Sequence, residues 1–183
     1  ASRGLGDVYK RQGVRAAVAV SPRVDNMIAV HTDFAGQEIA DQVEGAQLAQ
    51  LSDSGFSSFA AADAPSTQDE PPRGLAVRLG GLVNTLIGRQ MLSRDTSGVD
   101  ITVVSDIPLG SGLGALHATD AALCLALLAD DSDIDTAPLR TRLAEIASQS
   151  AKTFSDVPVV RSRHSAAMRG AGGTVSVVDY ADG

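Results

Sequence analysis

Three glycines at alternate positions, Gly110, Gly112 and Gly114, stand between an alternating apolar stretch and a long apolar segment. Glycine lets backbone N–H groups turn toward an anion and approach it closely. A helix that starts directly after such a loop adds unpaired N–H donors and the positive end of its dipole. The spacing therefore predicts a phosphate-binding loop, although a tight strand-to-helix turn with a packing role alone would use the same residues. The loop comprises Pro108, Gly110, Ser111, Gly112, Leu113, Gly114 and Ala115.

Three known glycine motifs do not match this loop. A P-loop needs a Lys after its last glycine, and none follows here. A dinucleotide-binding loop needs wider glycine spacing and an acidic residue after a second strand; residues 130–135 are acidic, but no strand is predicted before them. A nucleophile elbow needs one residue between the serine and each glycine, whereas Ser111 touches both glycines directly.

Helical and strand patterns alternate on both sides of the loop. Residues 99–104 alternate in polarity and predict a strand that leads into it, followed by a buried helix over residues 112–129. A second helix is predicted over residues 137–153, with Pro138 in its first turn. Leucines at helical spacing predict an amphipathic helix over residues 73–93, in which Gly80 and Gly81 either weaken the helix or admit a close neighbour.

The remaining segments complete a mixed architecture. Residues 14–21 and 26–30 predict two strands, and turn-forming residues between them favour a hairpin. Residues 35–59 are expected to be irregular or partly helical, residues 60–72 a loop, and residues 174–180 a final strand. Residues 154–168 stay ambiguous. Together these elements predict an α+β or α/β fold and argue against an all-α one, and of the two we expect α+β.

Composition narrows the class of partner. The 183 residues suit one domain, and the net charge of −7 with 3% aromatic residues argues against nucleic-acid binding. One cysteine, Cys124, excludes an internal disulfide and favours a reducing cytoplasm. No apolar run reaches the ~18–20 residues of a membrane span. We therefore expect a cytoplasmic protein with a small-molecule partner.

The sequence also leads to an expectation about each end of the chain. Residues 1–12 show no pattern that leads into the first predicted strand, and residues 4–12 resemble a translated sequencing-adapter junction. We therefore set residues 1–12 aside as a non-native leader. The chain stops three residues after the final predicted strand, so residues 13–183 are expected to be a partial domain.

The run DIPLGSGLG at residues 106–114 resembles the second motif of the GHMP kinases, and within them most closely that of galactokinase. Residues 18–29, 151–158 and 174–179 are similar to further galactokinase segments and fall in the same order. The resemblance implies the N-terminal domain of a GHMP-type kinase, a ribosomal protein S5 domain 2-like fold, with its C-terminal domain missing. It further implies transfer of the γ-phosphoryl group of ATP, with Mg²⁺, to the 1-hydroxyl of galactose.

Several positions depart from the family pattern. The loop serines of the family are replaced, because Gly114, Ala115 and Leu116 stand in their place. Asp120 lies where the family often has a glutamate and is the candidate Mg²⁺ ligand. His117, one turn into the helix, could meet a phosphate or serve only in packing.

The catalytic aspartate of the family aligns with Arg163. Arginine cannot accept a proton from a hydroxyl, although it can bind phosphate or orient a sugar. His164 and Asp156 are the candidate replacement bases. The sequence HTDF at residues 31–34 resembles the galactokinase sugar-binding motif, but it follows the early strands where the family motif precedes them, so we interpret it as coincidence.

Three functions are consistent with these residues. The first is an active galactokinase-like sugar kinase. The second is a galactokinase-like protein that binds nucleotide or sugar without catalysis, because the aspartate and the serines are replaced. The third is a dinucleotide-binding oxidoreductase, which rests on the three glycines alone and requires a parallel strand after the glycine helix.

Overall fold

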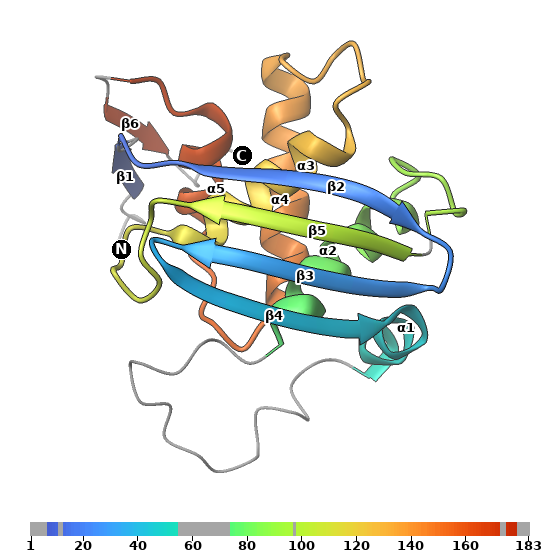
Figure 1. Cartoon of the computed structure of the whole chain (residues 1–183). Helices are drawn as coiled ribbons and strands as arrows, with labels where there is room; N and C mark the ends of the chain where they lie inside the picture. The colour runs from blue at the N-terminus through green and yellow to red at the C-terminus, as the bar shows by residue number, and fades with distance from the viewer. Residues whose placement is uncertain (1–6, 11–12, 55–73, 97, 173–174, 179–183) are drawn as a thin grey trace.

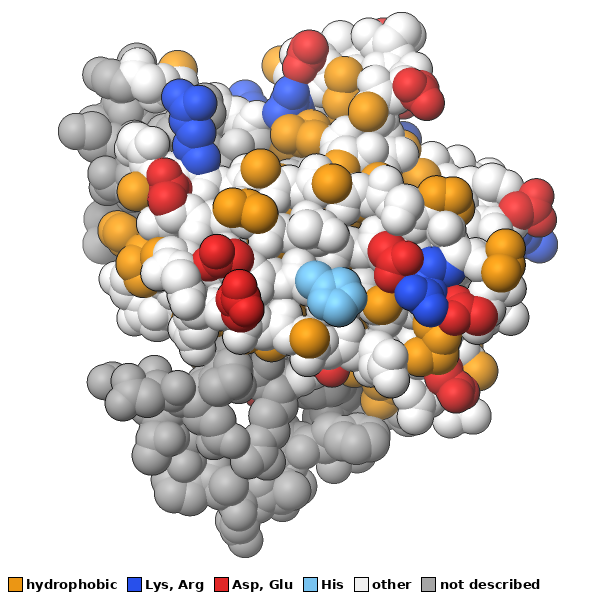
Figure 2. Space-filling model, viewed as in Figure 1, with side chains coloured by type: hydrophobic (Ala, Val, Ile, Leu, Met, Phe, Trp, Pro, Cys, Tyr) orange, Lys and Arg blue, Asp and Glu red, His pale blue; other side chains and the backbone are white. Residues whose placement is uncertain are grey.

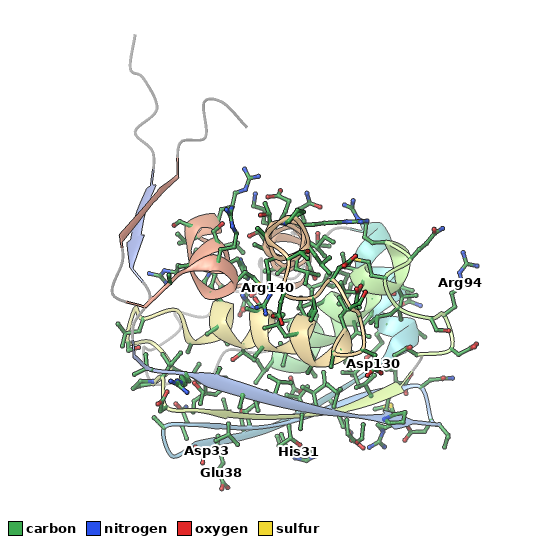
Figure 3. All side chains as sticks on the ribbon, turned by 90° about the horizontal axis from the view of Figure 1, so that it is seen from above. His31, Asp33, Glu38, Arg94, Asp130 and Arg140 are labelled. Carbon is green, nitrogen blue, oxygen red and sulfur yellow. The ribbon has the colours of Figure 1, made fainter. Side chains whose placement is uncertain are left out.

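A four-stranded sheet with helices on one of its faces forms the body of the molecule (Figures 1 and 3). The structure is a computed structural model and describes residues 7–10, 13–54, 74–96, 98–172 and 175–178. This arrangement confirms the α+β class. None of the helices in these ranges is long and apolar enough to cross a bilayer.

The sheet has the strand order β2-β5-β3-β4. Its strands are β2 (Ala16–Arg23), β3 (Met27–Phe34), β4 (Gln37–Glu44) and β5 (Gly98–Ser105). β5 runs parallel to β3 and antiparallel to β2, while β4 is antiparallel to β3. Val30 pairs with Ile101 in the middle of the sheet, and both side chains are buried in the core. The expected strand over residues 99–104 is thus confirmed.

The predicted hairpin of the first two strands is wrong. β2 and β3 both form, but β5 lies between them and pairs with each. Arg23, at the end of β2, donates a hydrogen bond of 2.7 Å to Asp100 on β5, which ties the inserted strand to the turn. Turn-forming residues indicate where a chain reverses, but they carry no information about a strand that arrives from much further along the sequence.

The true hairpin joins β3 to β4. Its turn is Ala35-Gly36, with positive φ at both residues (52° and 91°), as a primed two-residue turn requires. The side chain of Asp33 accepts a hydrogen bond of 2.7 Å from the Gly36 N–H. Where the sequence predicts irregular or partly helical chain over residues 35–59, the structure has β4 and the helix α1 (Gly45–Ser54), and the residues from 55 lie outside the described ranges.

Within the described residues, four further helices follow α1. They are α2 (Leu75–Gly88), α3 (Ala115–Leu127), α4 (Ala137–Phe154) and α5 (Arg161–Arg169). The first three confirm the predicted helices, and α5 occupies part of the segment that the sequence leaves ambiguous. α3 begins three residues later than expected, because the glycines before it adopt left-handed φ values that a helix does not contain.

The two glycines of α2 allow close packing. A Cβ atom added to Gly81 would lie 2.2 Å from Cγ of Phe154 on α4, and one added to Gly80 would lie 2.9 Å from Cδ1 of Leu48 on α1. The alternative that these glycines admit close neighbours is therefore the correct one. The two glycines therefore let α1 and α4 pack closely against α2.

A separate two-stranded ribbon joins the ends of the described chain. β1 (Asp7–Lys10) pairs antiparallel with β6 (Val175–Val178). β6 accounts for part of the expected final strand, and residues 174, 179 and 180 lie outside the described ranges. β1 lies within the segment that the sequence marks as a leader.

Candidate functional site

The glycine loop connects β5 to α3 at one end of the sheet. Gly110, Gly112 and Gly114 have φ values of 71°, 75° and 81°, in the region that disfavours side chains. A Cβ added to Gly112 would meet no atom within 4 Å, so this glycine is required by its backbone conformation and not by lack of space. The Ser111 hydroxyl donates to the Pro108 carbonyl at 2.7 Å and closes the loop on itself.

The start of α3 has no side-chain cap. Gly114 is the N-cap residue in a left-handed conformation, and no side chain caps the helix. The residues from Gly110 to Leu113 are largely exposed, with Leu113 at 47%. Uncapped N–H groups at the start of a 13-residue helix suit an anion. The structure thus brings the predicted loop residues together, with Gly110 to Leu113 on an exposed turn and Ala115, the first residue of α3, buried.

Arg163 lies beside this loop. A Cβ added to Gly114 would lie 3.5 Å from Cδ of Arg163, so the arginine stem packs against the N-cap residue. Arg163 is exposed, and among the described residues its side chain forms no ion pair. The structure therefore places a cation at the glycine loop, at the position where the galactokinase resemblance implies an aspartate.

Asp120 does not face the loop but joins a buried ion pair. Arg78 on α2 donates two hydrogen bonds to its carboxylate, from Nε to Oδ1 at 3.1 Å and from Nη2 to Oδ2 at 2.6 Å. His164 Nε2 lies 2.8 Å from the same Oδ2. Arg78, Asp120 and His164 are 3%, 1% and 0% exposed. Burial alone would raise the pKa of Asp120, but the charge and hydrogen bonds of Arg78 and the hydrogen bond of His164 lower it to about 2.

The expected Mg²⁺ role of Asp120 does not fit this geometry. Both carboxylate oxygens are already bonded, and the residue is out of reach of solvent. No group of three or more His, Cys, Asp or Glu side chains in the described ranges is arranged to hold a metal ion. The carboxylate instead neutralises a buried guanidinium.

His164 is not placed to act as a base. Its Nδ1 lies 2.9 Å from the Ser148 hydroxyl on α4, and its Nε2 faces Asp120. With Nε2–H donating to the carboxylate, Nδ1 accepts the Ser148 proton. The Ser148–His164–Asp120 chain has the residue types of a hydrolase triad, but Ser148 is only 1% exposed and no substrate can reach its hydroxyl. These two hydrogen bonds of His164 hold α5 against α3 and α4.

His117 serves as an uncharged anchor. Its Nε2 accepts a hydrogen bond of 3.3 Å from the Val160 N–H, just before α5, and its ring lies 4.6 Å from that of His164. Burial, followed by the charges of His164 and Arg78, lowers the pKa of His117 to about 3. The ring is therefore neutral at ordinary pH and holds the start of α5 in place, which favours the packing alternative over phosphate binding.

The remaining candidates lie apart from this cluster. Asp156 is exposed in the segment between α4 and α5. The HTDF sequence lies on β3, where His31 and Asp33 point to the helix-free face of the sheet (Figure 3). Thr32 and Phe34 alternate with them along the strand and are buried on the other face. That face carries acidic, basic and hydrophobic side chains in a mixed pattern (Figure 2). A split across two faces fits the interpretation of this match as coincidence.

The dinucleotide alternative lacks its required strand. α3 leads through the acidic residues 130–135 into α4, and the strand described after α4, β6, pairs with β1 and not with β5. The β-α-β unit that would hold a dinucleotide is not found in the described ranges.

Sequence reasoning missed Arg78 and Ser148, although the position of Arg78 in the sequence indicates a buried ion pair. It lies between Leu75, Leu79 and Leu82, on the apolar face of the predicted helix. An arginine in that position must be paired when buried. Asp120, alone on an equally apolar helix, was the natural partner. Ser148 left no comparable signal.

Comparison with protein-family models and with curated protein sequences finds no match to this chain. The galactokinase resemblance therefore rests on the motif residues of the chain itself, and the candidate site rests on the geometry of the glycine loop, Arg163 and the ion pair beneath them.

Proposed function

We propose that this chain is the nucleotide-binding part of a galactokinase-like protein of the GHMP kinase superfamily, with the ribosomal protein S5 domain 2-like fold. The observation that carries the proposal is the exposed loop of three left-handed glycines before the uncapped α3, with Arg163 packed against Gly114. Backbone donors and a helix dipole suit the phosphates of ATP, and a guanidinium can bind two phosphate oxygens at once.

As a sugar kinase, the protein would transfer the γ-phosphoryl group of Mg-ATP to the 1-hydroxyl of galactose in the cytoplasm. Phosphoryl transfer depends mostly on positioning and charge stabilisation, which the loop and Arg163 can supply. Mg²⁺ would arrive with ATP as part of the substrate, since Asp120 is engaged by Arg78 and His164. The sugar hydroxyl would still need a proton acceptor, and Asp156 is the exposed carboxylate nearest in sequence to α5.

Nucleotide binding without catalysis is the form that the geometry favours. His164 is fully buried with both ring nitrogens engaged, and Arg163 cannot accept a proton. A site that holds phosphates but offers no base at the position of the family aspartate would retain ATP and transfer its phosphoryl group slowly.

The two forms are separated by one pair of assays on the full-length protein. Calorimetry measures Mg-ATP binding, and a coupled assay measures ADP release with and without galactose. We expect binding with no galactose-dependent ADP. ADP release that requires galactose would overturn the non-catalytic form and support the kinase, and failure to bind ATP would overturn both.

A further inference from the structure

A hollow of about 600 Å³ opens at the end of the sheet opposite the glycine loop. Its walls come from the turn between β2 and β3, the start of α1, the middle of α2 and the loop before β5, whereas the glycine loop follows the end of β5 (Figure 1). Sites for small ligands measure about 300–1,000 Å³ and combine an apolar lining with a few polar groups. The hollow has this size.

The floor of the hollow is apolar. Met27 and Ile87 are half-buried and offer apolar surface to a ligand, whereas Ile28, Leu48 and Val83 are buried behind that surface. Such a floor takes a short aliphatic group, because burying apolar surface is favourable and no polar atom of the floor needs a partner.

The rim carries one free charge of each sign. Glu44 and Arg94 are exposed, and neither forms an ion pair within the part of the chain that the structure describes. Asp25, also on the rim, is already bonded to Arg23 at 2.5 Å, and the same guanidinium also bonds Asp100. Figure 3 shows Arg94 extending from its loop clear of other side chains. The Asn84 amide, on α2, has no hydrogen-bond partner among the described residues.

We propose that this hollow binds a small zwitterion with an aliphatic side chain, the chemistry of an α-amino acid such as leucine. The ligand ammonium pairs with Glu44, its carboxylate pairs with Arg94 and accepts from the Asn84 amide, and its side chain lies on the floor. A zwitterion matches both rim charges, whereas a ligand with one charge leaves the other rim group without a partner. The site is independent of the glycine loop.

The test uses L-leucine and two analogues that each lack one charge. Isoamylamine keeps the ammonium, and 4-methylpentanoate keeps the carboxylate. Binding to the 183-residue chain is followed by NMR shifts of the backbone amides of Ala46 and Asn84, with ATP absent. We expect leucine to shift these amides at about millimolar concentration and each analogue to bind about 10-fold more weakly or worse.

Matched variants locate the site. Glu44→Gln and Arg94→Gln should each weaken leucine binding about 10-fold, and Ala46→Phe, on the exposed first turn of α1, should block the hollow. Glu38→Gln on the same strand and Arg142→Gln on α4 should leave binding unchanged. No shift with leucine, equal affinity for either analogue, or binding that survives both rim variants would overturn the proposal.

Discussion

The Asp120 carboxylate on α3 and the Arg78 guanidinium on α2 form an ion pair in the core that is held by two hydrogen bonds. Their side chains are 2% and 3% exposed, so water cannot solvate either charge if the partner is removed. His164 adds a third bond to the same carboxylate, and Arg78 Nη1 also donates to Ser155 at 2.7 Å. The pair thereby links three helices and the end of a fourth beneath the glycine loop.

Breaking this pair from one side should be costly. Arg78→Met or Asp120→Leu alone should lower the free energy of unfolding by about 3–5 kcal/mol, because Asp120→Leu leaves the Arg78 charge without an ion-pair partner and Arg78→Met leaves the Asp120 carboxylate with His164 alone. The double variant removes both charges and should be no less stable than either single variant. Urea unfolding of the parent, the two single variants and the double variant measures the coupling between the two residues. Additive losses of stability would show that they act separately.

His117 should make the protein less stable as the pH falls. Its pKa is lowered from 6.5 to about 3 in the folded state, so below pH 6.5 the unfolded chain binds a proton that the folded chain refuses. Stability from this residue is complete above pH 6.5 and is lost as the pH falls toward 3. We expect a loss of about 2 kcal/mol between pH 6.5 and pH 5.

The control for this prediction is a second histidine. Urea unfolding across this pH range should show a much flatter dependence in His117→Gln, while His31→Gln, on the exposed face of β3, should keep the dependence of the parent. A parent whose stability is the same at both pH values would refute a buried neutral His117.

Gly81 should tolerate no side chain. Gly81→Ala places a methyl group 2.2 Å from the ring of Phe154 and should destabilise the protein by at least about 1–3 kcal/mol, through displacement of α2 from α4. Gly88→Ala, in the same helix, meets no atom within 4 Å and should leave stability unchanged or raise it by up to about 1 kcal/mol. Thermal unfolding compares the two; equal effects would argue against the close packing.

Arg163 should contribute to phosphate binding. Arg163→Ala should weaken ATP binding about 10-fold, since it removes a charge-assisted contact at the loop. Arg142→Ala, an exposed arginine on α4, controls for the loss of one positive charge from an acidic protein. Calorimetric titration of both variants measures the difference, and equal affinities would leave Arg163 with no role beyond packing against Gly114.

Local patterns predicted the elements around the glycine loop well. The alternation at Val99, Ile101 and Val103 and the leucine spacing of α2 are each determined within a few residues, and both elements form as expected. β4 was missed because its sequence, QEIADQVE, is mostly polar. Helices cover only one face of the sheet, so only every second side chain of β4 faces the core.

Non-local pairings could not be predicted in this way. The position of β5 between β2 and β3 depends on contacts between residues far apart in the chain. The burial of Asp120 and His164 depends on Arg78 and Ser148, which come from two other helices. Motif alignment gave Asp120 and His164 chemical roles, and only the packing of four helices shows that both side chains are sealed inside.

The proposed function depends on the binding of nucleotide phosphates by the glycine loop. Calorimetric titration of ATP and of adenosine into the full-length protein tests it most directly, with Gly112→Ala as the loop variant, because alanine is strained at a φ of 75°. We expect ATP to bind, adenosine to bind about 100-fold more weakly, and Gly112→Ala to reduce ATP binding. Equal binding of adenosine and ATP, or no binding of ATP, would contradict it.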